Sequence, residues 1–444
     1  MQTTQKIQDP QTDPIYLSGA AISSLIQTLP SGTGYFIGIV LIVMMTGRLM
    51  QQKGSLARAA LPLVVQIKWG WHRVERAMER GKFSLDSMIE VAYQWCINNL
   101  AVETVRLGSK QREVLALDSS TIARLRCTVG KAALLGKGYC HKAGRAIKAN
   151  IVAVIVSVVY IRGVRVGLTR LVRFGDSSET AVEAAFQQID KISTNSLVIV
   201  DAGIATKEKF AAATPASALV GRLRRNCKLR CAPKPVRKGK RGPKPKHGKV
   251  LHPGASRPEV KPVEDFKMLV AKGEQGEKKQ IRLRRWNKLH FEGYHTTELD
   301  LLRIDDPDYP EPLIVATTAT GELTTQEFLQ AYPHRWPVET LFFIGEETTA
   351  TEKPRAWTKL SLERRIGLGL LTASLLKAIA AMGNGLAIGP WDRNPQPSAG
   401  RLANHLDIHL AKFFQLALNG LAPRIYCNLL NVHDSNNLQS KQAA

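Results

Sequence analysis

Val114-Leu115-Ala116-Leu117-Asp118 is a run of four apolar residues followed by a carboxylate, and Leu197-Val198-Ile199-Val200-Asp201 repeats this pattern later in the chain. Short apolar runs of this kind are typical of buried strands. A carboxylate at the end of a buried strand is costly to place without a partner. We therefore predict two strands that end at Asp118 and Asp201, where both side chains face a common partner.

A third acid stands in Tyr332-Pro333-His334-Arg335-Trp336-Pro337-Val338-Glu339. Pro337 favours the first turn of a helix. Glu339 would then lie near a helix N-terminus, whose partial positive charge favours the ionised carboxylate. Converging carboxylates are how proteins hold hard divalent cations such as Mg²⁺. Asp118, Asp201 and Glu339 are therefore candidate metal ligands, although Asp118 could instead cap a turn at residues 119–121.

The order and setting of these acids resemble the DDE transposases of bacterial insertion sequences. The subgroup with a Tyr-x2-Arg-x3-Glu-x6-Lys signature fits best, because Tyr332, Arg335 and Glu339 match its first three positions. The fourth position is Glu346 in place of Lys. The resemblance covers roughly residues 110–385. It implies a catalytic triad of Asp118, Asp201 and Glu339 that binds two Mg²⁺ ions, for which Mn²⁺ can substitute.

The fold implied is α/β: a ribonuclease H-like mixed sheet with flanking helices, a helical N-terminal domain and a basic β-rich insertion. The activity implied is cleavage at the ends of a transposon, followed by attack of the freed 3′-OH on target DNA. The partners implied are double-stranded DNA, as terminal inverted repeats and target, and a second copy of the chain in a homodimeric DNA complex. The location implied is the bacterial cytoplasm, in association with the nucleoid.

Two alternatives from other functional classes stay open. One is a noncatalytic DNA-binding derivative of a transposase, which Glu346 slightly favours. The other is a structure-specific nuclease of the same fold without strand transfer. A strand-transfer assay on pre-cut ends would separate the nuclease from a transposase, and a cleavage assay would separate the noncatalytic derivative from both.

The charge of the chain favours DNA as a partner. Lys and Arg total 62 against 37 Asp and Glu, which gives a formal net charge of +25. Such a balance points to a polyanion. The Lys- and Arg-rich run 222–249 is interrupted by Pro and Gly, so we predict a flexible DNA clamp, with a nonspecific linker as the alternative. The candidate DNA contacts are Tyr332, Arg335, Arg222, Arg224, Arg225, Lys228, Arg230, Arg237, Lys238, Lys240, Arg241, Lys244 and Lys246.

Arg335 and its neighbours could contact DNA, or they could have purely structural roles. Arg335 offers a planar fork for bidentate phosphate contact, or it forms a salt bridge to a neighbouring acid. Tyr332 either donates its hydroxyl to a phosphate or packs as an aromatic residue. Trp336 could stack on a base, but we expect it in the core. Glu346 is expected on the surface.

The chain is expected to contain a disordered tail (1–14), a helical N-terminal domain with a possible role in DNA-end binding (15–108), a split catalytic core (109–221 and 311–385), the basic insertion (222–310) and a C-terminal helical region (386–444). A hairpin is predicted from 149–160 and 163–172, and one helix from Ser177 or Ser178 to about Asp190. The six cysteines lack paired metal-binding spacing, which predicts free thiols. The apolar run Tyr35–Met45 is too short to cross a bilayer, so no membrane partner is expected.

Overall fold

The structure, a computed structural model, describes residues 12–65, 71–123, 136–140, 144–175, 179–233, 248–272, 277–356, 358–383, 385–387 and 391–419. It is a mixed α/β protein in which helices flank an open sheet of parallel and antiparallel strands. The chain divides into two compact units. The first comprises Met1–Glu103, Ser119–Ala185 and Pro337–Ala444, and the second comprises Thr104–Asp118 and Phe186–Trp336. Strand β3 (Arg112–Ala123) contributes to both units.

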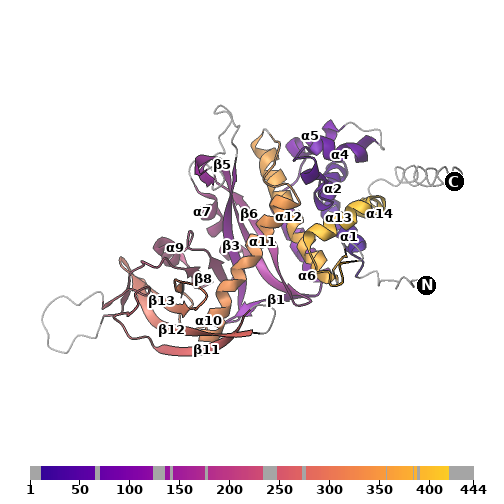
Figure 1. Ribbon diagram of the computed structural model, residues 1–444. Helices are drawn as coiled ribbons and strands as arrows, with labels where there is room; N and C mark the ends of the chain where they lie inside the picture. Colours follow the sequence, from indigo (N-terminus) through magenta and orange to yellow (C-terminus); the bar gives the residue numbers. More distant parts are fainter. Residues whose placement is uncertain are drawn as a thin grey trace, which may run out of the picture. The chain divides into compact units, whose positions relative to one another are not determined.

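The first unit is built around one long helix, α12 (Lys359–Met382), which packs against β6 (Val164–Phe174) and the N-terminal helices (Figure 1). Its other helices are α1 (Pro14–Gln27), α2 (Ser31–Met45), α3 (Arg48–Gln51), α4 (Leu56–Val65), α5 (His72–Arg80), α6 (Leu85–Asn99), α7 (Ala181–Phe186), α11 (Trp336–Glu347), α13 (Ala399–Ile408) and α14 (Leu410–Ala417). Arg364 of α12 is buried and donates to the carbonyls of Met78, Gly81 and Phe83. These bonds fix the start of α12 to the segment that joins α5 to α6.

Within the described part of the chain, α12 is the one helix that is long and apolar enough to cross a membrane. Of its most apolar window, 94% is buried inside the protein. Burial of this extent is typical of a helix at the centre of a folded core.

The predicted hairpin is confirmed. Strand β5 (Arg145–Ile161) pairs antiparallel with β6, from Ile161 opposite Val164 to Val152 opposite Phe174. The two connecting residues, Arg162 and Gly163, have φ angles of +48° and +78°. Positive φ at both central residues is the requirement of a type I′ turn, whose twist matches that of the flanking strands. Strand β4 (Gly136–Cys140) pairs with the start of β5.

The single helix predicted to end near Asp190 is wrong. Two short helices, α7 and α8 (Ile189–Ile192), stand in its place and are separated by a turn at residues 187–188. Ser177 and Ser178 lie outside the described residues. Thr180 caps α7 instead, because its hydroxyl accepts from the amide of Glu183 (3.2 Å) while the Glu183 carboxylate accepts from the amide of Thr180 (3.0 Å). This reciprocal cap satisfies two amides that the helix leaves unpaired.

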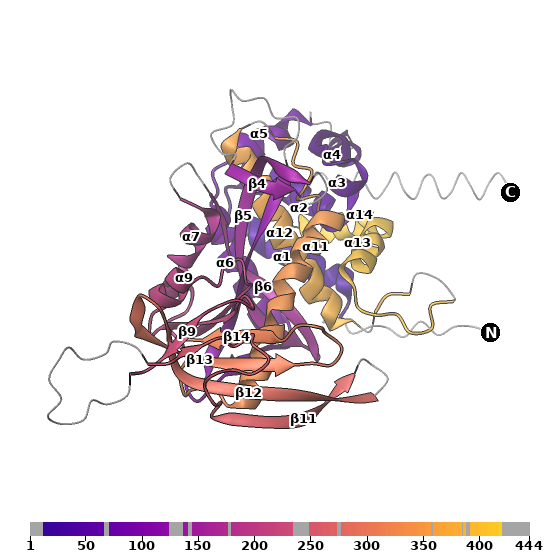
Figure 2. The same ribbon diagram turned by 60° about the vertical axis from the view of Figure 1, so that its left-hand side comes forward.

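The second unit contains a sheet in the order β3-β7-β8-β14-β13-β12-β9-β10, with β11 added on β12. Figure 2 shows β14, β13, β12 and β11 side by side. Strands β3, β7 and β8 are parallel, and the pairs from β8 to β14 onward are antiparallel. The strands are β7 (Ser196–Val200), β8 (Ser217–Arg222), β9 (Leu229–Cys231), β10 (Val250–Leu251), β11 (Glu264–Lys272), β12 (Glu277–Phe291), β13 (Tyr294–Asp305) and β14 (Leu313–Thr317). Its helices besides α8 are α9 (Lys207–Ala212), α10 (Thr325–Ala331) and the 3-10 helix η3 (Tyr332–Arg335).

The strands of the predicted insertion, β9 to β13, continue the sheet that contains β7 and β8. The prediction of a flexible basic run is wrong for residues 222–233, because Leu223 and Leu229 are buried and β9 pairs with both β10 and β12. Apolar residues between the cations anchor this part of the run to the sheet. The remainder of the run, 234–247, lies outside the described residues.

Candidate functional site

Asp118 and Asp201 follow neighbouring parallel strands. The register of β3 and β7 runs from Glu113 opposite Ser196 to Leu117 opposite Val200. Asp118 is the next residue of β3, and Asp201 directly follows the last residue of β7. Since adjacent strands lie about 4.8 Å apart and paired residues point to the same face, this register brings the two carboxylates side by side.

The two acids differ in how their strands continue. Asp201 directly follows the last residue of β7, as predicted, and its carbonyl accepts from the amides of Ile204 (3.0 Å) and Ala205 (2.8 Å) as the chain turns away. The prediction that Asp118 ends its strand is wrong, because β3 runs on to Ala123. Residues 119–121 are therefore strand, which removes the alternative of Asp118 as a turn cap.

One turn of helix η3 contacts both carboxylates. The hydroxyl of Tyr332 donates to Oδ1 of Asp201 over 3.1 Å. A guanidinium nitrogen of Arg335 lies 3.6 Å from Oδ2 of Asp118. Residues three apart on a 3-10 helix lie on the same face. The spacing of Tyr332 and Arg335 in the sequence therefore lets a single helical face meet one carboxylate within β3 and one directly after β7.

The pair formed by Arg335 and Asp118 is largely shielded from water, because their side chains are 11% and 20% exposed. The guanidinium also lies 5.6 Å from the ring centre of Tyr332 and 5.5 Å from that of Trp336. Burial raises the pKa of the Tyr332 phenol above its ordinary value. The charge of Arg335 opposes this shift, and the charge of Asp201 adds to it. The hydroxyl therefore remains protonated, and able to donate, at neutral pH.

The expectation that Trp336 fills the core is wrong. Its side chain is 58% exposed. Trp336 is the first residue of α11, and its neighbours Arg335 and Pro337 are the ones that are buried. The exposed indole of Trp336, beside the buried guanidinium of Arg335, fits the other interpretation, in which the ring contacts a nucleic-acid base.

Glu339 lies in the first turn of α11, as predicted, and is half-buried. Glu346 on the same helix is also half-buried and lines a cavity of about 190 Å³ with Ser120 and Ile122 of β3, so the expectation of a surface residue is wrong. Residues seven apart on an α-helix share a face. Glu339 therefore lies on the face of α11 that carries Glu346 toward β3 in the first unit.

No group of three His, Cys, Asp or Glu side chains is close enough to hold a metal ion among the residues that the structure describes. Two of the three predicted ligands, Asp118 and Asp201, are brought together in the second unit. Glu339 belongs to the first unit. Carboxylate oxygens on adjacent strands are nevertheless the donors that hard cations such as Mg²⁺ and Mn²⁺ prefer.

Arg112 is a positioning residue that the sequence did not reveal. At the start of β3, its guanidinium donates to the carbonyls of Ser196 (3.4 Å), Pro215 (3.0 Å) and Ala216 (3.4 Å). These carbonyls lie at the starts of β7 and β8. One buried cation thus fixes the register of three parallel strands at their N-terminal ends, away from Asp118 and Asp201. A charged residue directly before an apolar strand was the only sequence signal of this role.

The candidate DNA contacts of the basic run fall into three groups. Arg225 and Arg230 are each 2.8 Å from a carboxylate, of Glu311 and Glu292 respectively. In the described ranges, the remaining three are exposed and have no acidic partner: Arg222, Arg224 and Lys228. The others lie outside the described residues: Arg237, Lys238, Lys240, Arg241, Lys244 and Lys246.

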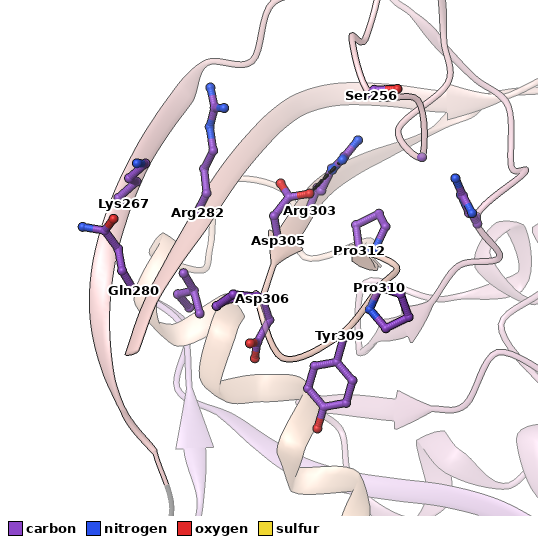
Figure 3. Close-up of a pocket in the computed structure, with 14 residues that line it drawn as sticks. Ser256, Lys267, Gln280, Arg282, Arg303, Asp305, Asp306, Tyr309, Pro310 and Pro312 are labelled. Carbon is purple, nitrogen blue, oxygen red and sulfur yellow. Dashed lines mark hydrogen bonds and ion pairs between the residues drawn. The ribbon is translucent and has the colours of Figure 1, made fainter. Parts of the chain in front are cut away.

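The second unit also contains a cavity of about 480 Å³ between β11, β12, β13 and the segment 305–312 (Figure 3). Its charged lining is mostly paired internally. Arg303 lies 2.7 Å from Asp305 and Arg282 lies 2.7 Å from Asp265, while Asp306 is held by Lys279. None of the predicted catalytic residues lines this cavity.

A search of protein-family models and of curated proteins finds no match to the chain. The geometry of Asp118, Asp201, Tyr332 and Arg335 therefore carries the functional inference.

Proposed function

We propose that the chain is a DNA transposase of the DDE type, which cuts the ends of an insertion sequence and joins them to target DNA. The observation that carries this proposal is the pair of carboxylates on neighbouring parallel strands, Asp118 and Asp201, both engaged by one turn of η3. The strand order β6-β5-β3-β7-β8, with the last three parallel, supports a ribonuclease H-like core. That fold requires a strand, a hairpin, a helix and then the strand that carries the second acid.

Asp118, Asp201 and Glu339 would hold the divalent cations. The donor set fits Mg²⁺ or Mn²⁺, since it consists of carboxylate oxygens and lacks thiolates and imidazoles. When bound, a pair of such ions supplies an activated oxygen nucleophile and stabilises the leaving 3′ oxygen.

Arg335 and Tyr332 would bind the phosphate that is attacked. The guanidinium of Arg335 presents two parallel N–H groups, which match two phosphate oxygens. The Tyr332 hydroxyl is a donor at neutral pH, since an ordinary phenol has a pKa of about 10 and burial raises the pKa of this one further. Both groups already lie at the two carboxylates, so a phosphate held by them would sit where the carboxylates act.

Double-stranded DNA is the proposed partner, in agreement with the net charge of +25. The exposed cations Arg222, Arg224 and Lys228 extend the phosphate contacts away from the carboxylates. Two element ends must be cut together, so the DNA complex is proposed to be a homodimer. A bacterial, nucleoid-associated protein would follow from this function.

The test uses a DNA fragment that carries the gene for this chain with its flanking sequence, because a transposase gene lies between the ends of its own element. With Mg²⁺ or Mn²⁺, the purified protein should cut at the flanks and join the cut ends to a target plasmid. Asp118→Ala and Asp201→Ala should each abolish cutting and retain DNA binding. Glu208→Ala, which removes an exposed acid of α9, should cut normally.

Two outcomes would overturn the proposal in favour of its rivals. Cutting without joining of pre-cut ends would indicate a structure-specific nuclease. Binding of the flanks without cutting in either metal would indicate a noncatalytic derivative, for which Glu346 in place of the family Lys would be a cause.

A further inference from the structure

Arg335 makes a contact that phosphate binding does not account for. Its guanidinium lies 3.6 Å from Asp118, and the residue is 9% exposed. A cation so placed is the counter-charge of a proposed metal ligand. The same η3 turn also places the Tyr332 hydroxyl on the other proposed ligand, Asp201.

The register of β3 and β7 places two negative charges close together, which explains why a cation lies beside them. Two carboxylates on adjacent strands repel each other, and a neighbouring cation relieves that repulsion. Arg335 supplies the positive charge and Tyr332 supplies a hydrogen bond. Both interactions use carboxylate oxygens that a divalent cation would need.

We propose that Arg335 exchanges between two anions, Asp118 in the free protein and a phosphate in the DNA complex, so that DNA and the divalent cation bind cooperatively. This inference rests on the proposed function of the carboxylates. The guanidinium beside Asp118 repels an incoming cation. A DNA phosphate that draws the guanidinium away removes this repulsion, and linkage requires the cation to strengthen DNA binding by the same factor.

The surroundings of Arg335 suit such an exchange. The guanidinium lies near the rings of Tyr332 and Trp336, at 5.6 Å and 5.5 Å from their centres. Contacts with aromatic rings stabilise a guanidinium without fixing its partner anion. Trp336 is 58% exposed, so one side of this aromatic pair opens toward solvent, where DNA would approach.

The experiment measures Mn²⁺ binding to the full-length protein by calorimetry and by the electron paramagnetic resonance signal of the free ion. A short duplex DNA of arbitrary sequence is the second ligand. For the unmodified protein, saturating DNA should lower the Kd of Mn²⁺ about tenfold. Arg335→Gln should bind Mn²⁺ about tenfold more tightly than the unmodified protein without DNA, and DNA should change its Kd little further.

Three variants serve as controls. Arg335→Lys keeps the charge and should bind Mn²⁺ as weakly as the unmodified protein. Lys267→Gln removes an exposed cation of β11 that lines the 480 Å³ cavity and has no proposed role in the site, and it should change the Kd of Mn²⁺ less than about twofold. Asp118→Asn should abolish specific Mn²⁺ binding. Circular dichroism verifies that each variant folds.

The outcomes separate the two proposals. If Mn²⁺ binding does not depend on Asp118, the proposed function fails. If it does depend on Asp118 but Arg335→Gln binds Mn²⁺ no more tightly, only the exchange fails.

A second measurement needs no substitution at Arg335. Divalent cations ordinarily weaken protein–DNA binding by competing for phosphates. The exchange predicts instead that saturating Mn²⁺ strengthens DNA binding about tenfold at constant ionic strength. Equal or weaker DNA binding would overturn it.

Discussion

Arg112 and Glu322 form a nearly buried ion pair, with Nε of Arg112 2.6 Å from Oε2 of Glu322. The pair lies at the start of β3, and Asp118 lies six residues further along the strand. Burial alone would raise the pKa of Glu322, but the hydrogen bonds from Arg112 and Lys110 outweigh it and lower the pKa below its usual range. The charged pair thus lies at the start of β3, and the site carboxylates lie at the other end of the paired segment of β3 and β7.

Glu322→Gln should therefore destabilise the protein by about 3 kcal/mol at pH 7, because it leaves Arg112 buried without its carboxylate. A carboxylate with a lowered pKa in the folded state stabilises it above the unfolded pKa of about 4.3. This stabilisation is lost as the pH falls through the folded pKa. Denaturant unfolding from pH 7 to pH 3 should show the difference between the variant and the unmodified protein shrinking below about pH 5.

Glu311→Gln is the matched control for this experiment. It breaks the ion pair between Glu311 and Arg225. Their side chains are 57% and 59% exposed, respectively. Its effect should stay within about 0.5 kcal/mol. An equal loss in both variants would contradict a special role for the buried pair.

Tyr332→Phe keeps the aromatic ring and removes the donor to Asp201. We expect the single-turnover rate of DNA cutting to fall about tenfold, since one hydrogen bond near the reacting phosphate is lost. The affinity for duplex DNA should stay within about twofold, because many phosphate contacts carry it. A cutting rate equal to that of the unmodified protein would exclude a role for this hydroxyl.

Arg224→Ala and Lys228→Ala each remove an exposed cation of the basic run. Each should reduce the slope of log Kd against log salt by about one, with a similar loss of affinity for all sequences. Fluorescence anisotropy over a series of salt concentrations measures the slope. Arg393→Ala, an exposed cation in the C-terminal region, should leave the slope unchanged if DNA binds along the basic run.

Gly167→Ala tests the support of α11 by β6. A Cβ at Gly167 would lie 3.1 Å from Cβ of Pro337 and 3.1 Å from a methyl group of Val156. We expect a loss of about 1–3 kcal/mol in unfolding free energy from overpacking. Displacement of the start of α11 should also weaken Mn²⁺ binding through Glu339.

Gly400→Ala provides the comparison for that variant. A Cβ at Gly400 meets nothing within 4 Å, and the residue lies in helix α13. Alanine there should raise stability by up to about 1 kcal/mol. If both variants bind Mn²⁺ equally tightly, the packing of Gly167 against α11 does not affect the role of Glu339 in Mn²⁺ binding.

The sequence by itself determined the local elements of the protein. An apolar run of strand length predicted β7, and the consecutive runs 149–160 and 163–172 predicted the hairpin of β5 and β6. The resemblance to the transposase signature singled out Tyr332 and Arg335 as candidate site residues. These features are readable because periodicity and turn preference depend on residues that are close together in the chain.

Only the tertiary structure decided how those elements meet. The register that sets Asp118 beside Asp201 arises from hydrogen bonds between strands distant in the chain. Three features depend on which surfaces pack together: the pairing of Arg335 with Asp118, the exposure of Trp336 and the hydrogen bonds of Arg112 to the starts of β7 and β8. A side chain's burial and partner are properties of its neighbours in space, so the residue type alone does not determine them.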